Sequence, residues 1–144
     1  MASELKIKEL EDDDAIAAVF DLAVVLRPHL KPQTFIAQVR AQQQEGYRLI
    51  AGFAEARPVV LAGFRRPTTL ARGPHLFVDD LVTAPTEQGK GYATAMLRRL
   101  AGIARESGLS RIWLDSRDTA KTFYQQVGFT LHSSVPCWID VDRL

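Results

Sequence analysis

A strand, a glycine-containing turn and an amphipathic helix follow one another without a break in the middle of this chain. Residues 76–83 have the composition of a β-strand, and Gly89 and Gly91 come shortly after them. Apolar residues then recur at helical spacing over residues 88–107, and Gly108 ends the pattern. This succession predicts a helix packed on a sheet, with its first backbone N–H groups gathered beyond the end of a strand.

The segments on either side predict a single α+β domain that covers residues 1–144. Short apolar or alternating runs indicate strands, and apolar stripes at helical spacing indicate helices. No repeat, low-complexity segment or long linker divides the chain. The expected strands are residues 5–10, 47–54, 59–64, 76–83, 111–115, 129–131 and 135–141, and the expected helices are residues 16–27, 32–45, 88–107 and 118–126.

The composition argues against several classes of function. Apolar residues make up 47% of the 144 residues and charged residues 24%, as in ordinary globular proteins. The 18 Lys and Arg nearly balance the 17 Asp and Glu, so the chain as a whole has no field that attracts nucleic acid or an anionic membrane. No run approaches the roughly 18 apolar residues that cross a bilayer. We therefore expect no nucleic-acid partner and no membrane partner.

Cysteine and histidine usage indicates a reducing compartment and no metal. Cys137 is the only cysteine and can form no internal disulfide, and no export signal is visible, so the cytoplasm is the expected location. His29, His75 and His132 are far apart in sequence and have no ligand spacing with Cys137, which predicts that there is no metal site. Cys137, next to Trp138, is expected to be a buried thiol.

The turn at residues 88–94 has features of a phosphate-binding loop. A helix N-terminus offers unpaired N–H groups and the positive end of the helix dipole, and glycines let a bulky anion approach the backbone. The nucleotide-triphosphatase loop needs Ser or Thr after its Gly-Lys pair, whereas Gly91 follows Lys90 here. The dinucleotide fingerprint needs Gly or Ala at the position of Thr94. Both interpretations fail on spacing.

A third loop pattern is met at every fixed position. It consists of Gln or Arg, two residues, Gly, one residue, then Gly or Ala, and Gln88, Gly91 and Ala93 satisfy it. This segment resembles the coenzyme A loop of the GCN5-related N-acetyltransferase (GNAT) family. About 30 residues later, residues 120–129 are similar to the same family's Ala-x-x-Phe-Tyr-x-x-x-Gly-Phe element. The resemblance is clearest over residues 76–129.

That resemblance implies a GNAT-like fold and a binding mode for acetyl-coenzyme A. The fold is α+β, with a mixed, mostly antiparallel central sheet of six to seven strands flanked by about four helices. In the family, the backbone of the strand before the loop pairs with the pantetheine arm, which corresponds here to Leu81, Val82 and Thr83. The pyrophosphate would lie over the loop and the first helical turn, at Gln88, Gly89, Lys90, Gly91, Tyr92, Ala93 and Thr94.

Tyr124 is the candidate proton donor. It occupies the position of the tyrosine that commonly donates to the sulfur of coenzyme A in the family. A phenol with a reference pKa of about 10 is protonated at neutral pH. The alternative is that the ring only packs on the cofactor.

Asp79 and Asp80 are the candidate acceptor-binding residues. They lie in an otherwise apolar strand, where a carboxylate is costly unless it faces polar surroundings. Because successive strand residues point to opposite faces, we expect at most one of them to face the acceptor. Asp79 is favoured as general base and amine ligand, because its spacing from the loop matches an acidic residue of the family's polyamine acetyltransferases. The alternative is a structural pair with Arg65 or Arg111.

The sequence therefore predicts an N-acetyltransferase that moves the acetyl group of acetyl-coenzyme A to an amine by direct attack in a ternary complex. A small cationic amine is slightly preferred to a peptide amine because of Asp79 and Asp80. The alternative from another class is a non-catalytic acetyl-coenzyme A sensor or regulatory module, which shares the loop but has no use for Tyr124 as a proton donor. Neither the acceptor nor the number of copies follows from the sequence, so a homodimer stays open.

Overall fold

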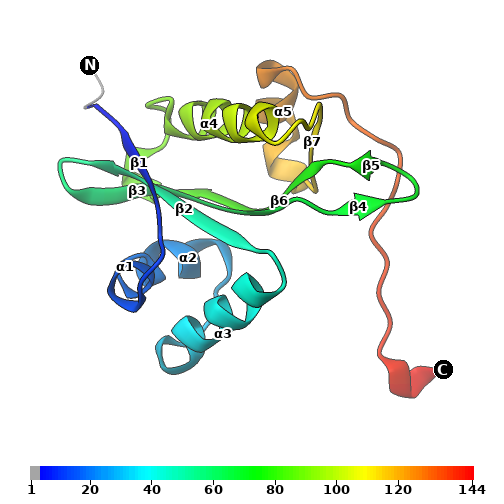
Figure 1. Ribbon diagram of the computed structural model, residues 1–144, viewed down its shortest axis with the longest axis horizontal. Helices are drawn as coiled ribbons and strands as arrows, with labels where there is room; N and C mark the ends of the chain where they lie inside the picture. The colour runs from blue at the N-terminus through cyan, green and yellow to red at the C-terminus, as the bar shows by residue number, and fades with distance from the viewer. Residues whose placement is uncertain (1–3) are drawn as a thin grey trace.

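A five-stranded sheet lies between two layers of helices in the computed structural model, which describes residues 4–144 (Figure 1). The strand order is β1-β2-β3-β6-β7, and every neighbouring pair is antiparallel except β6 and β7. The strands of this sheet are β1 (Lys6–Glu9), β2 (Arg48–Ala54), β3 (Arg57–Arg65), β6 (Leu76–Thr83) and β7 (Ile112–Leu114). A separate two-residue ribbon, β4 (Thr68–Thr69) with β5 (Gly73–Pro74), was not predicted.

The helices divide between the two faces of the sheet. Figure 1 shows α1 (Asp13–Ala17), α2 (Phe20–Leu26) and α3 (Pro32–Gln44) on one face, and α4 (Tyr92–Glu106) and α5 (Lys121–Val127) on the other. Three short 3-10 turns complete the structure: η1 (Pro85–Glu87), η2 (Asp118–Ala120) and η3 (Val141–Arg143). The predicted α+β class is confirmed. No helix within residues 4–144 is long and apolar enough to span a membrane.

Each face of the sheet has its own apolar core, because side chains of a strand alternate between faces. Along β3, Val60, Ala62 and Phe64 pack with α4 and α5, whereas Leu61 packs with α1, α2 and α3. The core on the α4 side contains the apolar stripe seen in the sequence, including Met96, Leu97 and Leu100. The strong amphipathic pattern of α4 thus predicted its place correctly.

The helix expected over residues 16–27 is divided into α1 and α2. Asp12 caps α1 by accepting a hydrogen bond from the Ala15 N–H at 2.8 Å. The Val19 N–H then bonds to the Ile16 carbonyl at 3.2 Å, which tightens the chain into a turn. Both of these apolar residues are fully buried. The turn between the two helices keeps Ile16 and Val19 in the apolar core on this face of the sheet.

The two strands expected at residues 129–131 and 135–141 are absent, which corrects that prediction. Residues 129–140 have no regular secondary structure, and Figure 1 shows this segment leaving the sheet. Cys137, expected to be buried, is exposed. A period-two apolar pattern favours an extended conformation, but a strand also needs a neighbour with free backbone groups. Within residues 4–144 this segment pairs with neither edge strand of the main sheet, β1 or β7, so that sheet has five strands instead of six or seven.

Candidate active site

A cleft opens where β6 and β7 separate. The two strands pair over only three positions: Leu76 with Ile112, Phe77 with Trp113 and Val78 with Leu114. Beyond that point β6 continues to Thr83, and within residues 4–144 its only partner strand there is β3. Backbone groups on the second edge of β6 are therefore left without a neighbouring strand. A cleft of about 650 Å³ occupies this opening.

Most of the predicted cofactor-binding residues line this cleft. Leu81, Val82 and Thr83 contribute from β6, and the loop and start of α4 contribute Gln88, Gly89, Gly91, Tyr92, Ala93 and Thr94. Lys90 is the exception, because its ammonium group bonds to Glu87 at 2.7 Å. Arg117, at the end of the segment after β7, also lines the cleft and donates a hydrogen bond to the Leu26 carbonyl at 2.7 Å.

The N-terminus of α4 is suited to an anion. Gly91 is the N-cap residue and has φ of 85°, a left-handed conformation that glycine adopts without strain. In the described part of the chain no side chain makes a capping hydrogen bond at the N-terminus of this 15-residue helix, whose first N–H groups have no partner inside the helix. Unpaired donors together with the helix dipole favour a phosphate at this end of the cleft.

Glu87 fixes the loop, a role that the sequence did not reveal. Its side chain is only 5% exposed, yet it is charged, and it accepts hydrogen bonds from Lys90 at 2.7 Å and from Arg57 at 2.8 Å. These two bonds, that of Lys90 first, hold the pKa of Glu87 below its usual value. The carboxylate thus ties the start of β3 to the turn before α4. An isolated Glu in a loop carries no sequence signal for such a role.

Tyr124 lines the same cleft from α5. Its ring packs edge-on between Phe123 and Phe129, with centroids 5.1 Å and 5.3 Å away. Burial raises the pKa of Tyr124, so the phenol remains protonated at neutral pH. The structure records no hydrogen bond from its hydroxyl to any residue of the described chain, 4–144, and this donor is therefore available inside the cleft.

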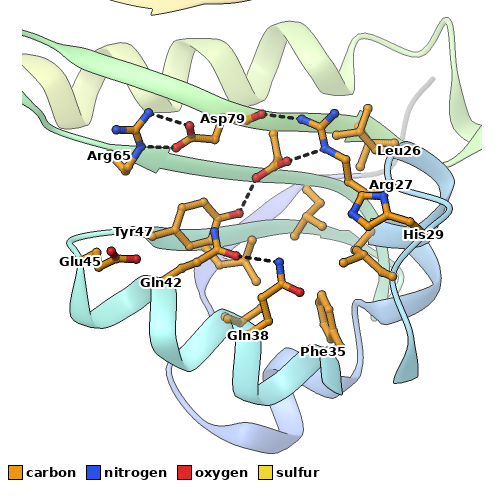
Figure 2. Close-up of a pocket in the computed structure, with 17 residues that line it drawn as sticks. Leu26, Arg27, His29, Phe35, Gln38, Gln42, Glu45, Tyr47, Arg65 and Asp79 are labelled. Atoms are coloured by element: carbon orange, nitrogen blue, oxygen red, sulfur yellow. Dashed lines mark hydrogen bonds and ion pairs between the residues drawn. The ribbon is translucent and has the colours of Figure 1, made fainter. Parts of the chain in front are cut away.

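A second cavity, of about 690 Å³, lies between the sheet and the α2–α3 layer (Figure 2). Asp79 and Asp80 both line it, although regular alternation along a strand would turn their side chains to opposite faces. The reason is a β-bulge. Along β3 the register passes from Gly63 opposite Asp80 to Phe64 opposite Val78, which leaves Asp79 as an extra residue. A bulge interrupts the alternation of faces, and two successive side chains can then turn toward one cavity.

Both carboxylates are held by arginines, and Figure 2 shows the Arg65–Asp79 pair. Arg65 donates two hydrogen bonds to Asp79, at 2.7 Å and 2.8 Å, which is the pair that the sequence left as an alternative. Arg27 donates to a carboxylate oxygen of Asp80 at 3.0 Å and to the backbone carbonyl of Asp79 at 2.8 Å. The guanidinium at the end of α2 thereby fixes the bulge.

Tyr47 completes the arrangement from the start of β2. Its hydroxyl donates a hydrogen bond to the second carboxylate oxygen of Asp80 at 2.8 Å. Burial and then the nearby charge of Asp80 raise the pKa of Tyr47 above its usual range, so it remains a donor. The ring passes so close to Gly63 that a Cβ there would lie 1.7 Å from the hydroxyl oxygen. The sequence analysis identified neither Arg27 nor this glycine, because their roles depend on contacts distant in sequence.

The cavity and the cleft adjoin each other. Leu26, Arg27, Asp79 and Val82 line both of them. One compartment is bounded by the open edge of β6 and the glycine loop, and the other by the paired carboxylates. The arrangement can hold an elongated anionic thioester on one side and an amine on the other. Within residues 4–144 no group of three or more His, Cys, Asp or Glu side chains is placed to hold a metal ion.

Comparison with known families decides the identity of this fold. The model of the acetyltransferase (GNAT) family matches residues 6–129. The chain belongs to the GNAT family. It is 30% identical over 134 residues to the uncharacterized N-acetyltransferase YhdJ of Bacillus subtilis (strain 168), a match that covers 90% of this chain and 94% of the relative. The chain is therefore an acyltransferase of the N-acetyltransferase type, as predicted.

Solved structures show the same GNAT fold. An aminoglycoside N-acetyltransferase, AAC(6')-Iy, in complex with coenzyme A matches with a TM-score of 0.83 at 14% identity, over 98% of this chain and 97% of that chain. An acetyltransferase of Trypanosoma brucei matches with a TM-score of 0.74 at 23% identity, over 96% of this chain and 100% of that chain. At these identities the structural matches establish the fold alone.

Proposed function

We propose that this GNAT enzyme transfers the acetyl group of acetyl-coenzyme A directly to an amine bound in the second cavity. The observation that carries the proposal is the junction of the two compartments at Arg27, Asp79 and Val82. A donor in the cleft and an acceptor in the cavity would meet there without a covalent enzyme intermediate. When bound, acetyl-coenzyme A supplies the thioester from which the acetyl group leaves.

The cleft residues fit such a donor. The unpaired edge of β6 over Leu81, Val82 and Thr83 offers backbone hydrogen bonds to an extended, amide-containing chain. The loop with Gly89 and Gly91 and the uncapped start of α4 offer donors to phosphates. Lys90 does not line the cleft, and its charge is already paired with Glu87.

We assign proton donation to Tyr124. Its hydroxyl has no partner among residues 4–144, and burial keeps it protonated, so it can donate to the departing thiolate. Removal of this hydroxyl should slow transfer without preventing binding. The alternative, a ring that only packs on the donor, predicts that Tyr124→Phe has no effect on the rate.

We assign amine binding to Asp79 and Asp80. Each carboxylate oxygen has a second lone pair beyond the hydrogen bonds to Arg65, Arg27 and Tyr47, so an ammonium group can still be accepted. Around the cavity the three carboxylates, which include Glu45, outnumber the two guanidinium groups. This balance favours a small cationic amine over a peptide amine. Asp79 would take the proton from the amine through a water molecule.

The test is release of free thiol from acetyl-coenzyme A in the presence of a panel of polyamines, amino acids, aminoglycosides and short peptides. We expect release that depends on the amine, with the highest kcat/KM for small polycationic acceptors. In Tyr124→Phe we expect kcat to fall by about 10²-fold, the lower range for loss of a general acid. Thr68→Val removes a hydroxyl from the β4–β5 ribbon, away from both compartments, and should retain full activity.

Two results would count against the proposal. If acetyl-coenzyme A binds but no amine releases thiol, the sensor or regulatory interpretation gains support. If Tyr124→Phe is as active as the parent chain, the hydroxyl is not the proton donor and the ring only packs.

A further inference from the structure

One wall of the second cavity is formed by α3, and this wall is partly polar. Gln38 and Gln42 line the cavity beside the buried apolar residues Phe35 and Val39. Residues four apart lie on one face of a helix, so the two amides are neighbours. Figure 2 shows both side chains rising from α3 toward the sheet. Phe35 and Val39 belong to the apolar core, which leaves the two amides for contact with a ligand.

The two amides bond to each other and keep most of their bonding capacity. The Gln38 Nε2 group donates to the Gln42 Oε1 atom at 3.3 Å, which is longer than most N–H···O bonds in proteins. Within residues 4–144 the structure records no other bond to either side-chain amide. The Gln42 N–H groups therefore remain as donors, and the Gln38 carbonyl oxygen remains as an acceptor. A ligand atom that both donates and accepts fits this pair.

The two arginines that line the cavity add further donors without a partner. Arg65 uses its Nε and Nη2 atoms for Asp79, and Arg27 uses the same two atoms for Asp80 and for the backbone of Asp79. The Nη1 atom of each arginine has no recorded partner among residues 4–144. Beside its carboxylates, the cavity thus offers N–H groups that only an acceptor atom of the ligand can satisfy.

An alkyl amine does not supply such an acceptor. At neutral pH its ammonium groups are donors without a lone pair, and its methylene groups neither donate nor accept. A ligand group that displaces water without reproducing the hydrogen bonds of that water loses affinity. A hydroxyl group has one donor and two lone pairs, so it can accept from Gln42 and donate to Gln38. Hydroxyl groups beside the amine therefore complement the bonds that the cavity leaves open.

We propose that Gln38 and Gln42 are specificity-determining residues, which select amines whose carbon body carries hydroxyl groups. The inference rests on the proposed function, because the amine itself is bound by Asp79 and Asp80 in the same cavity. A cavity of about 690 Å³ has room for a ring-sized acceptor that extends from the carboxylates to α3. The acceptor class is therefore narrower than small cationic amines in general, and polyhydroxylated amines are preferred to alkyl polyamines.

Two diamines that differ only in hydroxyl groups test the selection. They are cis-1,3-diaminocyclohexane and the triol of the same diamine, 4,6-diaminocyclohexane-1,2,3-triol. For each, kcat/KM for thiol release is measured with the parent chain and with Gln38→Leu plus Gln42→Leu. We expect the parent chain to prefer the triol, and this preference to fall by about 10-fold in the double variant, as for the loss of one or two hydrogen bonds. The comparison between chains cancels the difference in basicity between the two diamines.

The matched control is Gln33→Leu with Gln44→Leu. Both residues are exposed on α3 and line neither compartment, so the preference should equal that of the parent chain. The Kd of acetyl-coenzyme A should be unchanged in both double variants, because the cleft is untouched. If the leucine pair at the cavity prevents folding, Gln42→Glu keeps the side-chain shape, removes the N–H donors and should also lower the preference for the triol.

The outcomes separate this inference from the proposed function. A parent chain that prefers the alkyl diamine, an unchanged preference in the cavity variant, or an equal fall in the control would overturn the selection by the amide pair, and acetyl transfer would stand. If other amines are acetylated but neither diamine is, their inhibition constants against the best amine are compared in the same way. If acetyl-coenzyme A binds but no amine releases thiol, the proposed function and this inference both fail.

Discussion

Gly63 leaves room for the Tyr47 ring beside the cavity that we propose holds the acceptor. A Cβ at this position would lie 1.7 Å from the hydroxyl oxygen of Tyr47 and 2.3 Å from its Cζ atom. In Gly63→Ala the ring must therefore move, and its hydrogen bond to Asp80 breaks. We expect the free energy of unfolding to fall by about 1–3 kcal/mol, as for overpacked cores. We also expect the acceptor KM to rise, while the acetyl-coenzyme A Kd stays the same.

A second glycine gives the matched control. Gly102 lies inside α4, and apart from its chain neighbours and the backbone of its own helix nothing in the described chain would lie within 4 Å of an added Cβ. Gly102→Ala should raise the free energy of unfolding by about 0.5–1 kcal/mol, because alanine has the higher helix propensity. Urea unfolding measures both changes. Equal stability of the parent chain and Gly63→Ala would contradict the role assigned to this contact.

Single residues also show where sequence reasoning reaches its limit. Gln88, Gly91 and Ala93 are local signals, because a loop and the helix after it fold from neighbouring residues, and all three line the cleft. Tyr47 and Arg27 both bond to Asp80, although they precede it in the chain by 33 and 53 positions. Such contacts depend on how distant elements pack, so one sequence contains no pattern for them.

At the scale of elements, Glu87 holds the turn η1 and the loop before α4 in place through its bonds to Lys90 and Arg57. We expect Glu87→Gln to weaken acetyl-coenzyme A binding at neutral pH, because the turn loses its charged bonds to Lys90 and Arg57. These bonds lower the pKa of Glu87 in the folded chain below that of the unfolded chain. The stabilisation is therefore complete above the unfolded carboxyl pKa and is lost as the pH falls through the folded pKa.

Urea unfolding midpoints, measured at several pH values from 7 down to about 3, test whether the stabilisation by Glu87 is lost as the pH falls. The parent chain should be more stable than Glu87→Gln near neutrality, and the two curves should converge in acid. Glu106→Gln, which changes an exposed carboxylate at the end of α4, should follow the parent chain throughout. If the difference in unfolding midpoint between the parent chain and Glu87→Gln were independent of pH, the charged hydrogen bonds of Glu87 to Lys90 and Arg57 would not be the source of the stabilisation.

Elements with strong periodicity were predicted well, and those that depend on a partner were not. The amphipathic stripe predicted α4, and the two apolar runs around residues 55–58 predicted the hairpin of β2 and β3. The bulge at Asp79 follows from the register between two strands, which the sequence of one strand does not contain. The strands predicted at residues 129–131 and 135–141 are absent for a related reason, since an alternating pattern does not show whether a segment pairs with a sheet edge.

At the scale of the whole molecule, the sheet separates the helices into two layers and brings the two compartments together at one strand. β6 supplies its open edge to the cleft and its bulged carboxylates to the cavity. Arg27 reaches this strand from α2 and lines both compartments. The account therefore requires donor and acceptor to be bound at the same time.

Initial-rate kinetics with both substrates varied test this requirement most directly. With the best amine of the panel, double-reciprocal plots of thiol release at several fixed concentrations of acetyl-coenzyme A should intersect, as for a ternary complex. Parallel lines, together with an acetylated enzyme detected by mass spectrometry in the absence of amine, would show a covalent intermediate and contradict direct transfer between the two compartments.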